Sequence, residues 1–96
     1  MIKSICILGG GTSGLITALV LNRWYPSIDI TIIESSKVGI IGVGEGSTEH
    51  WRTFMQTVGI PLKELINETG ATFKTGIKFE NWNGDGKSYK IGRAHV

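Results

Sequence analysis

The first residues of this chain whose types and spacing could do chemistry are the glycines near its N-terminus. Residues 9–14 have the sequence Gly-Gly-Gly-Thr-Ser-Gly, which fits the pattern G-x-G-x-x-G. In that pattern Gly9 permits a tight turn, Gly11 lets a pyrophosphate approach the backbone, and Gly14 lets a helix pack closely on a strand. The cluster therefore predicts a turn that binds the pyrophosphate of a dinucleotide, and a tight turn without a ligand is the alternative.

Polar groups beside this turn complete the predicted site. A helix that starts here presents free N–H groups, including those of Thr12 and Ser13, and its positive dipole to an anion. Glu34 follows Gly14 by 20 residues, which is close to the spacing at which an acid binds the ribose hydroxyls. A carboxylate there disfavours the additional phosphate of NADP; the alternative is an acid at a surface strand end. Together these features predict a dinucleotide but do not separate FAD from NAD.

The segments around the turn have the patterns that such a motif requires. Residues 2–8 form an apolar, β-branched run that predicts a buried strand. Residues 13–24 carry apolar side chains at helical spacing, and Pro26 follows where a helix should have ended. Residues 28–34 predict a second strand. Strand, helix and strand together predict a right-handed βαβ unit, the start of a Rossmann-like α/β fold.

A second group of glycines interrupts an apolar segment over residues 35–46. Glycines weaken a strand interior, so we expect an ordered loop that packs against a neighbouring surface. We expect Ser47 to cap a helix over residues 48–58. A further helix is expected to start at Pro61 and to end at Gly70.

Residues 73–82 alternate between two sets of side chains, which predicts a strand with one buried face. The buried set would be Phe73, Thr75, Ile77 and Phe79. Lys74 belongs to the other set. The sequence Asn-Gly-Asp-Gly at residues 83–86 predicts a turn after this strand.

Two of these segments carry a resemblance to a known family. Residues 42–48, G-V-G-E-G-S-T, and residues 73–82, F-K-T-G-I-K-F-E-N-W, are similar, together with the N-terminal turn, to the tryptophan-halogenase family of flavin-dependent halogenases. The resemblance covers roughly residues 3–90. It implies that the dinucleotide is FAD, used as FADH₂ with O₂ and a halide ion to make hypohalous acid. The acid then travels through an internal tunnel to an aromatic, tryptophan- or indole-like substrate, and a separate flavin reductase supplies the reduced flavin.

The resemblance also assigns residues to the site. Lys74 matches the lysine that acts near the substrate, and residues 35–48 match the family's flavin strap, with Val43, Gly44, Glu45 and Ser47 as expected flavin contacts. A neutral Lys74 amine could be N-halogenated, whereas an ammonium could hydrogen-bond and polarise hypohalous acid; both alternatives stay open. Without the family motif, Lys74 would be an exposed strand lysine. Glu45 could equally be a loop acid that pairs with a nearby base.

The resemblance places this chain at the beginning of a longer enzyme. The family's W-x-W-x-I-P motif and its second catalytic residue, a later glutamate, do not occur in these residues. We therefore expect residues 1–90 to be the N-terminal part of the FAD-binding halogenase domain, and inactive alone. Residues 91–96, Ile-Gly-Arg-Ala-His-Val, can be encoded by a sequence that resembles a common sequencing-library adapter, so we expect an artefactual tail.

Composition limits the remaining function classes. The chain is 41% hydrophobic with a net charge of +2, which is too little charge for a nucleic-acid partner. No apolar run has the roughly 18 residues of a membrane span. One cysteine, Cys6, is expected to be a small buried hydrophobe in a cytoplasmic protein. His50 has no second histidine at metal spacing, so no metal is expected.

Two other functions remain open at this stage. One is a flavin monooxygenase or another FAD- or NAD-binding oxidoreductase, which would share the glycine turn and Glu34 but give Lys74 no role. The other is a non-catalytic nucleotide-binding truncation.

Overall fold

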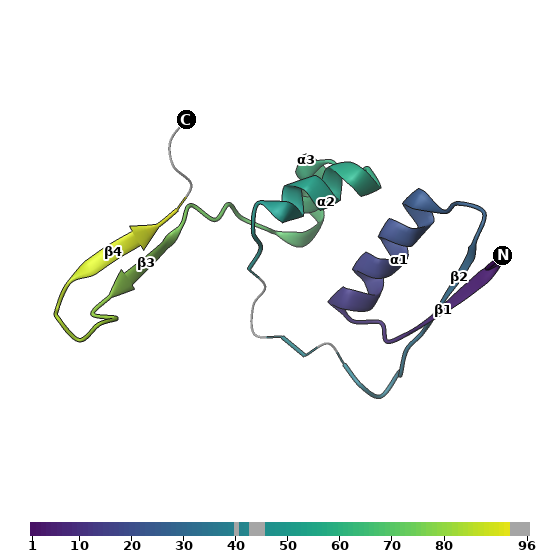
Figure 1. The fold of residues 1–96 in the computed structure, drawn as a ribbon, viewed down its shortest axis with the longest axis horizontal. Coiled ribbons are helices and arrows are strands. Elements are labelled where there is room, and N and C mark those ends of the chain that lie inside the picture. The colour runs from purple at the N-terminus through teal and green to yellow at the C-terminus, as the bar shows by residue number, and fades with distance from the viewer. Residues whose placement is uncertain (40, 43–45, 93–96) are drawn as a thin grey trace.

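The computed structural model describes residues 1–39, 41–42 and 46–92 of the chain. Within them the elements follow in this order: β1 (Ser4–Leu8), α1 (Thr12–Trp24), β2 (Asp29–Ile33), α2 (His50–Val58), α3 (Leu62–Thr69), β3 (Ile77–Glu80) and β4 (Ser88–Ile91). The strands β1 and β2 form a parallel pair, and β3 and β4 form an antiparallel hairpin. Figure 1 shows the hairpin at one end of the molecule and the parallel pair at the other.

The predicted strand–helix–strand unit is confirmed. β1 and β2 pair in parallel from Ser4 opposite Asp29 to Leu8 opposite Ile33, and α1 contacts both strands. Alternate residues of each strand are half-buried beneath α1: Ile5, Ile7, Ile30 and Ile32. The chain is thus a Rossmann-like α/β protein at its N-terminal end, with the helix on one face of the parallel pair.

The other face of the parallel pair is open, and one prediction fails there. Cys6 is exposed, and Leu8 beside it is 86% exposed. The prediction of a buried cysteine is therefore wrong for this chain. Its physical reason is the two-residue period of a strand, which points Cys6 away from α1, toward a face that no described element covers.

The two helices after the strap begin and end close to the predicted residues. α2 begins at His50, two residues after the predicted start, and its N-cap residue is Glu49, with no capping bond from a side chain. The prediction that Ser47 caps this helix is therefore wrong. Gly70 ends α3 in the left-handed conformation, with φ of 67°, as expected. Pro61 is the N-cap residue of α3 rather than its first residue.

The interior lies where α2 meets α1. Met55 of α2 is the one buried side chain among the described residues, with 4% of its surface exposed. Arg23 of α1 donates from Nε to the carbonyl oxygen of Thr57 in α2 at 3.0 Å. This bond ties the end of α2 to the βαβ unit.

The predicted strand over residues 73–82 is shorter in the structure. β3 holds only Ile77–Glu80, because Gly76 adopts φ of 152° and breaks the extended chain before it. Lys74 therefore lies in the irregular segment before β3, not in a strand. The predicted turn at residues 83–86 is present, and β4, which was not predicted, pairs with β3 beyond it.

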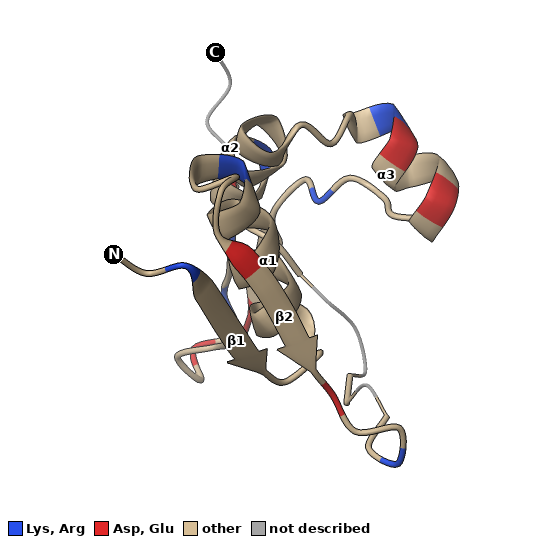
Figure 2. Cartoon of the chain, turned by 90° about the vertical axis from the view of Figure 1, so that its right-hand side faces the viewer, with Lys and Arg blue, Asp and Glu red and all other residues tan. Residues whose placement is uncertain are grey.

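The molecule is elongated. Its Cα radius of gyration is 18.1 Å, whereas a compact chain of this length would have about 12 Å. Figure 2 shows β1 and β2 side by side, and the lysines and arginines are scattered over the ribbon rather than gathered on one face.

Candidate dinucleotide-binding site

Gly9 makes the turn that leaves β1. Its φ of 122° lies in the region that side chains disfavour. The Gly9 N–H donates to the carbonyl oxygen of Ile33 at 2.8 Å. The turn is thereby fixed against the last residue of β2, directly before Glu34.

Gly11 is the N-cap residue of α1, where the site is open. Its carbonyl oxygen accepts from the Leu15 N–H at 3.0 Å, and no side chain caps the helix. The first N–H groups of α1, including those of Thr12 and Ser13, therefore have no partner within the helix and can bind an anion. A Cβ built on Gly11 would have nothing within 4 Å. This free space above a helix N-terminus fits the approach of a pyrophosphate.

Gly14 allows the close packing that the motif predicts. A Cβ at this position would collide with the carbonyl oxygen of Gly9 and would lie 3.4 Å from Cγ2 of Ile7. Any side chain here would push α1 away from β1. The glycine therefore serves the helix–strand packing.

Glu34 follows β2 and lines a hollow together with the glycine turn. The hollow has a volume of about 640 Å³, a size typical of small-molecule sites. Its lining consists of Leu8, Gly9, Gly10, Gly11, Thr12, Ile33, Glu34, Ser35, Val38, Gly39 and Ile41. A helix N-terminus with free N–H groups and a carboxylate thus line one hollow.

The structure brings together some of the predicted residues and not others. Ser13 and Gly14 lie in the first turn of α1 but do not line the hollow, and neither does Ser47. The lining residues that were not among the predicted contacts are Leu8, Gly10, Ile33, Ser35, Val38, Gly39 and Ile41. The sequence held one sign that Gly10 matters to the site: it is a glycine at a position where the motif accepts any residue.

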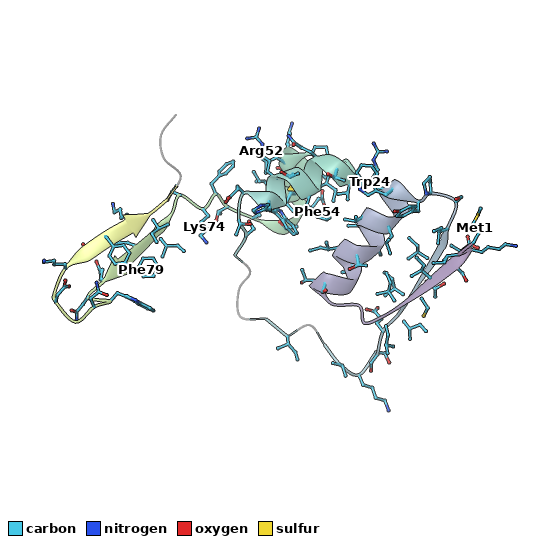
Figure 3. All side chains as sticks on the ribbon, in the orientation of Figure 1. Met1, Trp24, Arg52, Phe54, Lys74 and Phe79 are labelled. Atoms are coloured by element: carbon cyan, nitrogen blue, oxygen red, sulfur yellow. The ribbon has the colours of Figure 1, made fainter. Side chains whose placement is uncertain are left out.

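Lys74 lies near the far end of the strap. Its side chain is exposed, and its Nζ is 4.0 Å from the place that a Cβ on Gly46 would take. Figure 3 shows Lys74 between the hairpin and the start of α2. Among the predicted strap contacts, Val43, Gly44 and Glu45 lie outside the described residues. Lys74 and the hollow thus lie by opposite ends of one segment, residues 35–48.

In the described ranges, His, Cys, Asp and Glu side chains form no cluster of three or more that could hold a metal ion. In the same part of the chain, every helix is too short or too polar to cross a membrane.

The fold and the hollow define a dinucleotide-binding α/β protein of the Rossmann type. The family model described as tryptophan halogenase matches residues 4–95. The chain therefore belongs to the tryptophan halogenase family, whose structurally characterised members matched here include flavin-dependent halogenases.

Individual relatives agree with this assignment. The chain is 40% identical over 77 residues to the 7-chloro-L-tryptophan 6-halogenase of a Kutzneria species. The matched residues cover 79% of the chain and 15% of that protein. The chain is 38% identical over 88 residues to a tryptophan 6-halogenase of Streptomyces albogriseolus, covering 90% and 17%. A flavin-dependent halogenase of Xanthomonas campestris has a similar structure, with a TM-score of 0.90, 33% identity, and coverage of 99% and 20%. The chain thus spans about a sixth to a fifth of these proteins.

Proposed function

We propose that this chain provides the FAD-holding beginning of a flavin-dependent halogenase that acts on a tryptophan- or indole-like aromatic substrate. The observation that carries the proposal is the hollow that the α1 N-terminus and Glu34 line together, within a chain of this family. When bound, reduced FAD would supply two of the four electrons that reduce O₂, and chloride or bromide would supply the other two and be oxidised to hypohalous acid, with water as the second product.

Different groups of residues would bind different parts of the cofactor. The glycine turn and the first N–H groups of α1 would bind the pyrophosphate, through Gly9, Gly11, Thr12, Ser13 and Gly14. Glu34 would accept hydrogen bonds from the ribose hydroxyls. The strap would contact the flavin ring through Val43, Gly44, Glu45 and Ser47.

Lys74 would act on the halogen close to the substrate. As an ammonium it would donate a hydrogen bond to hypohalous acid and polarise it; as a free amine it would carry the halogen itself. Its place beside Gly46 supports a role next to the strap. The neighbouring Lys78 is ion-paired with Glu80, so it is the less suitable of the two lysines.

A separate flavin reductase would supply FADH₂, and the reaction would take place in the cytoplasm. Residues 1–90 would belong to the FAD-binding domain, and residues 91–96, of which Ile91 ends β4, would be dispensable for FAD binding. Deleting residues 91–96 should leave FAD affinity unchanged within about twofold; a larger loss would contradict this boundary.

Titration of the 96-residue chain with FAD, followed by flavin fluorescence, tests the cofactor assignment. We expect binding, and we expect Glu34→Gln to weaken it by about tenfold, because hydrogen bonds to a charged acceptor are worth about 1.5–3 kcal/mol. Glu64→Gln, an exposed acid on α3, is the matched control. Absence of binding would favour a truncation that does not hold the nucleotide.

The catalytic assignment needs a protein of the relatives' length. Residues 1–90 can replace the matching part of the Xanthomonas campestris halogenase, and halogenated product can be measured with FADH₂, O₂ and bromide. Product formation would support the proposal. A chimera that binds FAD but forms no halogenated product would favour another flavin oxidoreductase.

A further inference from the structure

Gly10 is a glycine that the backbone does not require. It stands at a variable position of G-x-G-x-x-G, and its φ does not lie in the left-handed region, unlike that of Gly9. An alanine at this position would therefore be free of backbone strain. The reason for a glycine must lie in the space around it.

That space is taken by Glu34. A Cβ built on Gly10 would overlap Oε2 of Glu34 and would lie 2.9 Å from both its Cβ and its Cδ. All three of its nearest atoms belong to this one side chain. The carboxylate of Glu34 therefore rests directly on the bare backbone of Gly10.

The two segments cannot separate easily to make room. The bond from the Gly9 N–H to the Ile33 carbonyl oxygen, 2.8 Å long, joins the residues directly before Gly10 and Glu34. Since the backbones are tied at this point, a methyl group on residue 10 has to be accommodated by rotation of the Glu34 side chain. Rotation would move the carboxylate off the turn.

Gly11 provides a direct contrast. A Cβ there would meet nothing within 4 Å, so a methyl group would occupy only the space left for a ligand. Substitution of Gly11 would therefore hinder a ligand directly. Substitution of Gly10 would act through Glu34.

From these contacts we infer that Gly10 is a positioning residue, whose missing side chain lets the Glu34 carboxylate lie over the turn where the ribose of a dinucleotide is bound. The inference rests on the proposed function, because it takes Glu34 to be a ligand of the FAD ribose. It adds a determinant of FAD affinity that touches Glu34 and need not touch FAD.

A double-mutant cycle on the 96-residue chain tests this inference, with FAD affinity measured by flavin fluorescence. Gly10→Ala should weaken FAD binding by about tenfold, as much as the loss of the Glu34 carboxylate. In a Glu34→Gly background, which removes all three clashing atoms, Gly10→Ala should change affinity by less than about twofold. Gly11→Ala is the matched control and should weaken binding equally in both backgrounds.

The melting temperature without FAD, followed by circular dichroism, separates positioning from misfolding. Gly10→Ala should leave it within about 2 °C of the parent chain. If Gly10→Ala leaves FAD affinity unchanged, or weakens it equally with and without Glu34, the inference is overturned. If the parent chain does not bind FAD, the proposed function fails as well, and this outcome is distinct from the first two.

Discussion

The glycine turn and the Lys74 segment differ in how much of their surroundings this chain provides. The turn is held by contacts within the first 34 residues: the Gly9–Ile33 hydrogen bond, the close packing at Gly14, and the Glu34 carboxylate on Gly10. Lys74 is exposed, and its Nζ lies near Gly46, which comes much earlier in the chain. The glycine turn is thus held by close contacts within the βαβ unit, whereas Lys74 lies in an exposed, irregular segment.

Lys74→Ala should have the largest effect. In the Xanthomonas chimera it should lower the rate of halogenation by about 10²-fold or more, the range of a lost proton donor. FAD affinity should stay within about twofold, because the cofactor turn does not depend on this side chain. Lys78→Ala is the matched control and should retain activity. Intact halogenation in the Lys74→Ala chimera would remove the catalytic role.

Gly14→Ala should disturb the packing of α1 on the glycine turn and β1. The added Cβ collides with the Gly9 carbonyl oxygen, and overpacking of this kind costs about 1–3 kcal/mol. Urea unfolding followed by circular dichroism measures the change in the free energy of unfolding. Gly39→Ala is the control, since its Cβ meets open space and should change stability by less than about 0.5 kcal/mol. Equal effects of the two substitutions would contradict the packing role of Gly14.

Arg23→Ala should loosen the connection between α1 of the βαβ unit and α2. It removes the hydrogen bond to the Thr57 carbonyl oxygen, and such a bond contributes about 0.5–1.5 kcal/mol. The same urea experiment measures it, with Arg52→Ala, an exposed arginine of α2, as the control. If Arg52→Ala costs as much as Arg23→Ala, this bond does not fix α2 on α1.

Glu80→Ala should have the smallest effect. The Lys78–Glu80 ion pair lies on an exposed face of the hairpin, where such pairs contribute about 1 kcal/mol or less. Phe79→Ala is the comparison, because the Phe79 ring stacks on Tyr89 with centroids 5.0 Å apart. Thermal melting should show the larger loss for Phe79→Ala. The reverse order would mean that charge, not aromatic packing, holds the hairpin.

Local patterns predicted the elements that form from local contacts. The βαβ unit follows from two apolar β-branched runs around a helix, and Gly70 ends α3 because a glycine accepts the left-handed conformation. Predictions failed where a neighbour decides the outcome. Cys6 is exposed because its face of the parallel pair has no cover among the described residues. Ser47 does not cap α2, because α2 begins at His50, two residues after the predicted start.

The hairpin was the least predictable element. The alternation over residues 73–82 predicted one long strand, but the positive φ of Gly76 shortens it to β3. β4 has only four residues, too few for a periodic pattern to stand out. Its pairing with β3 comes from the turn between them, which brings Phe79 opposite Tyr89.

The sequence by itself determined the dinucleotide turn, the acid that follows the second strand, and the family to which the chain belongs, because each depends on residue type and short spacing. Only the tertiary structure decided that the Glu34 carboxylate rests on Gly10 and that the Lys74 amine lies near Gly46. Both arrangements bring together residues far apart in the chain, and no local pattern encodes them. The space around a residue is set by the segments that fold against it.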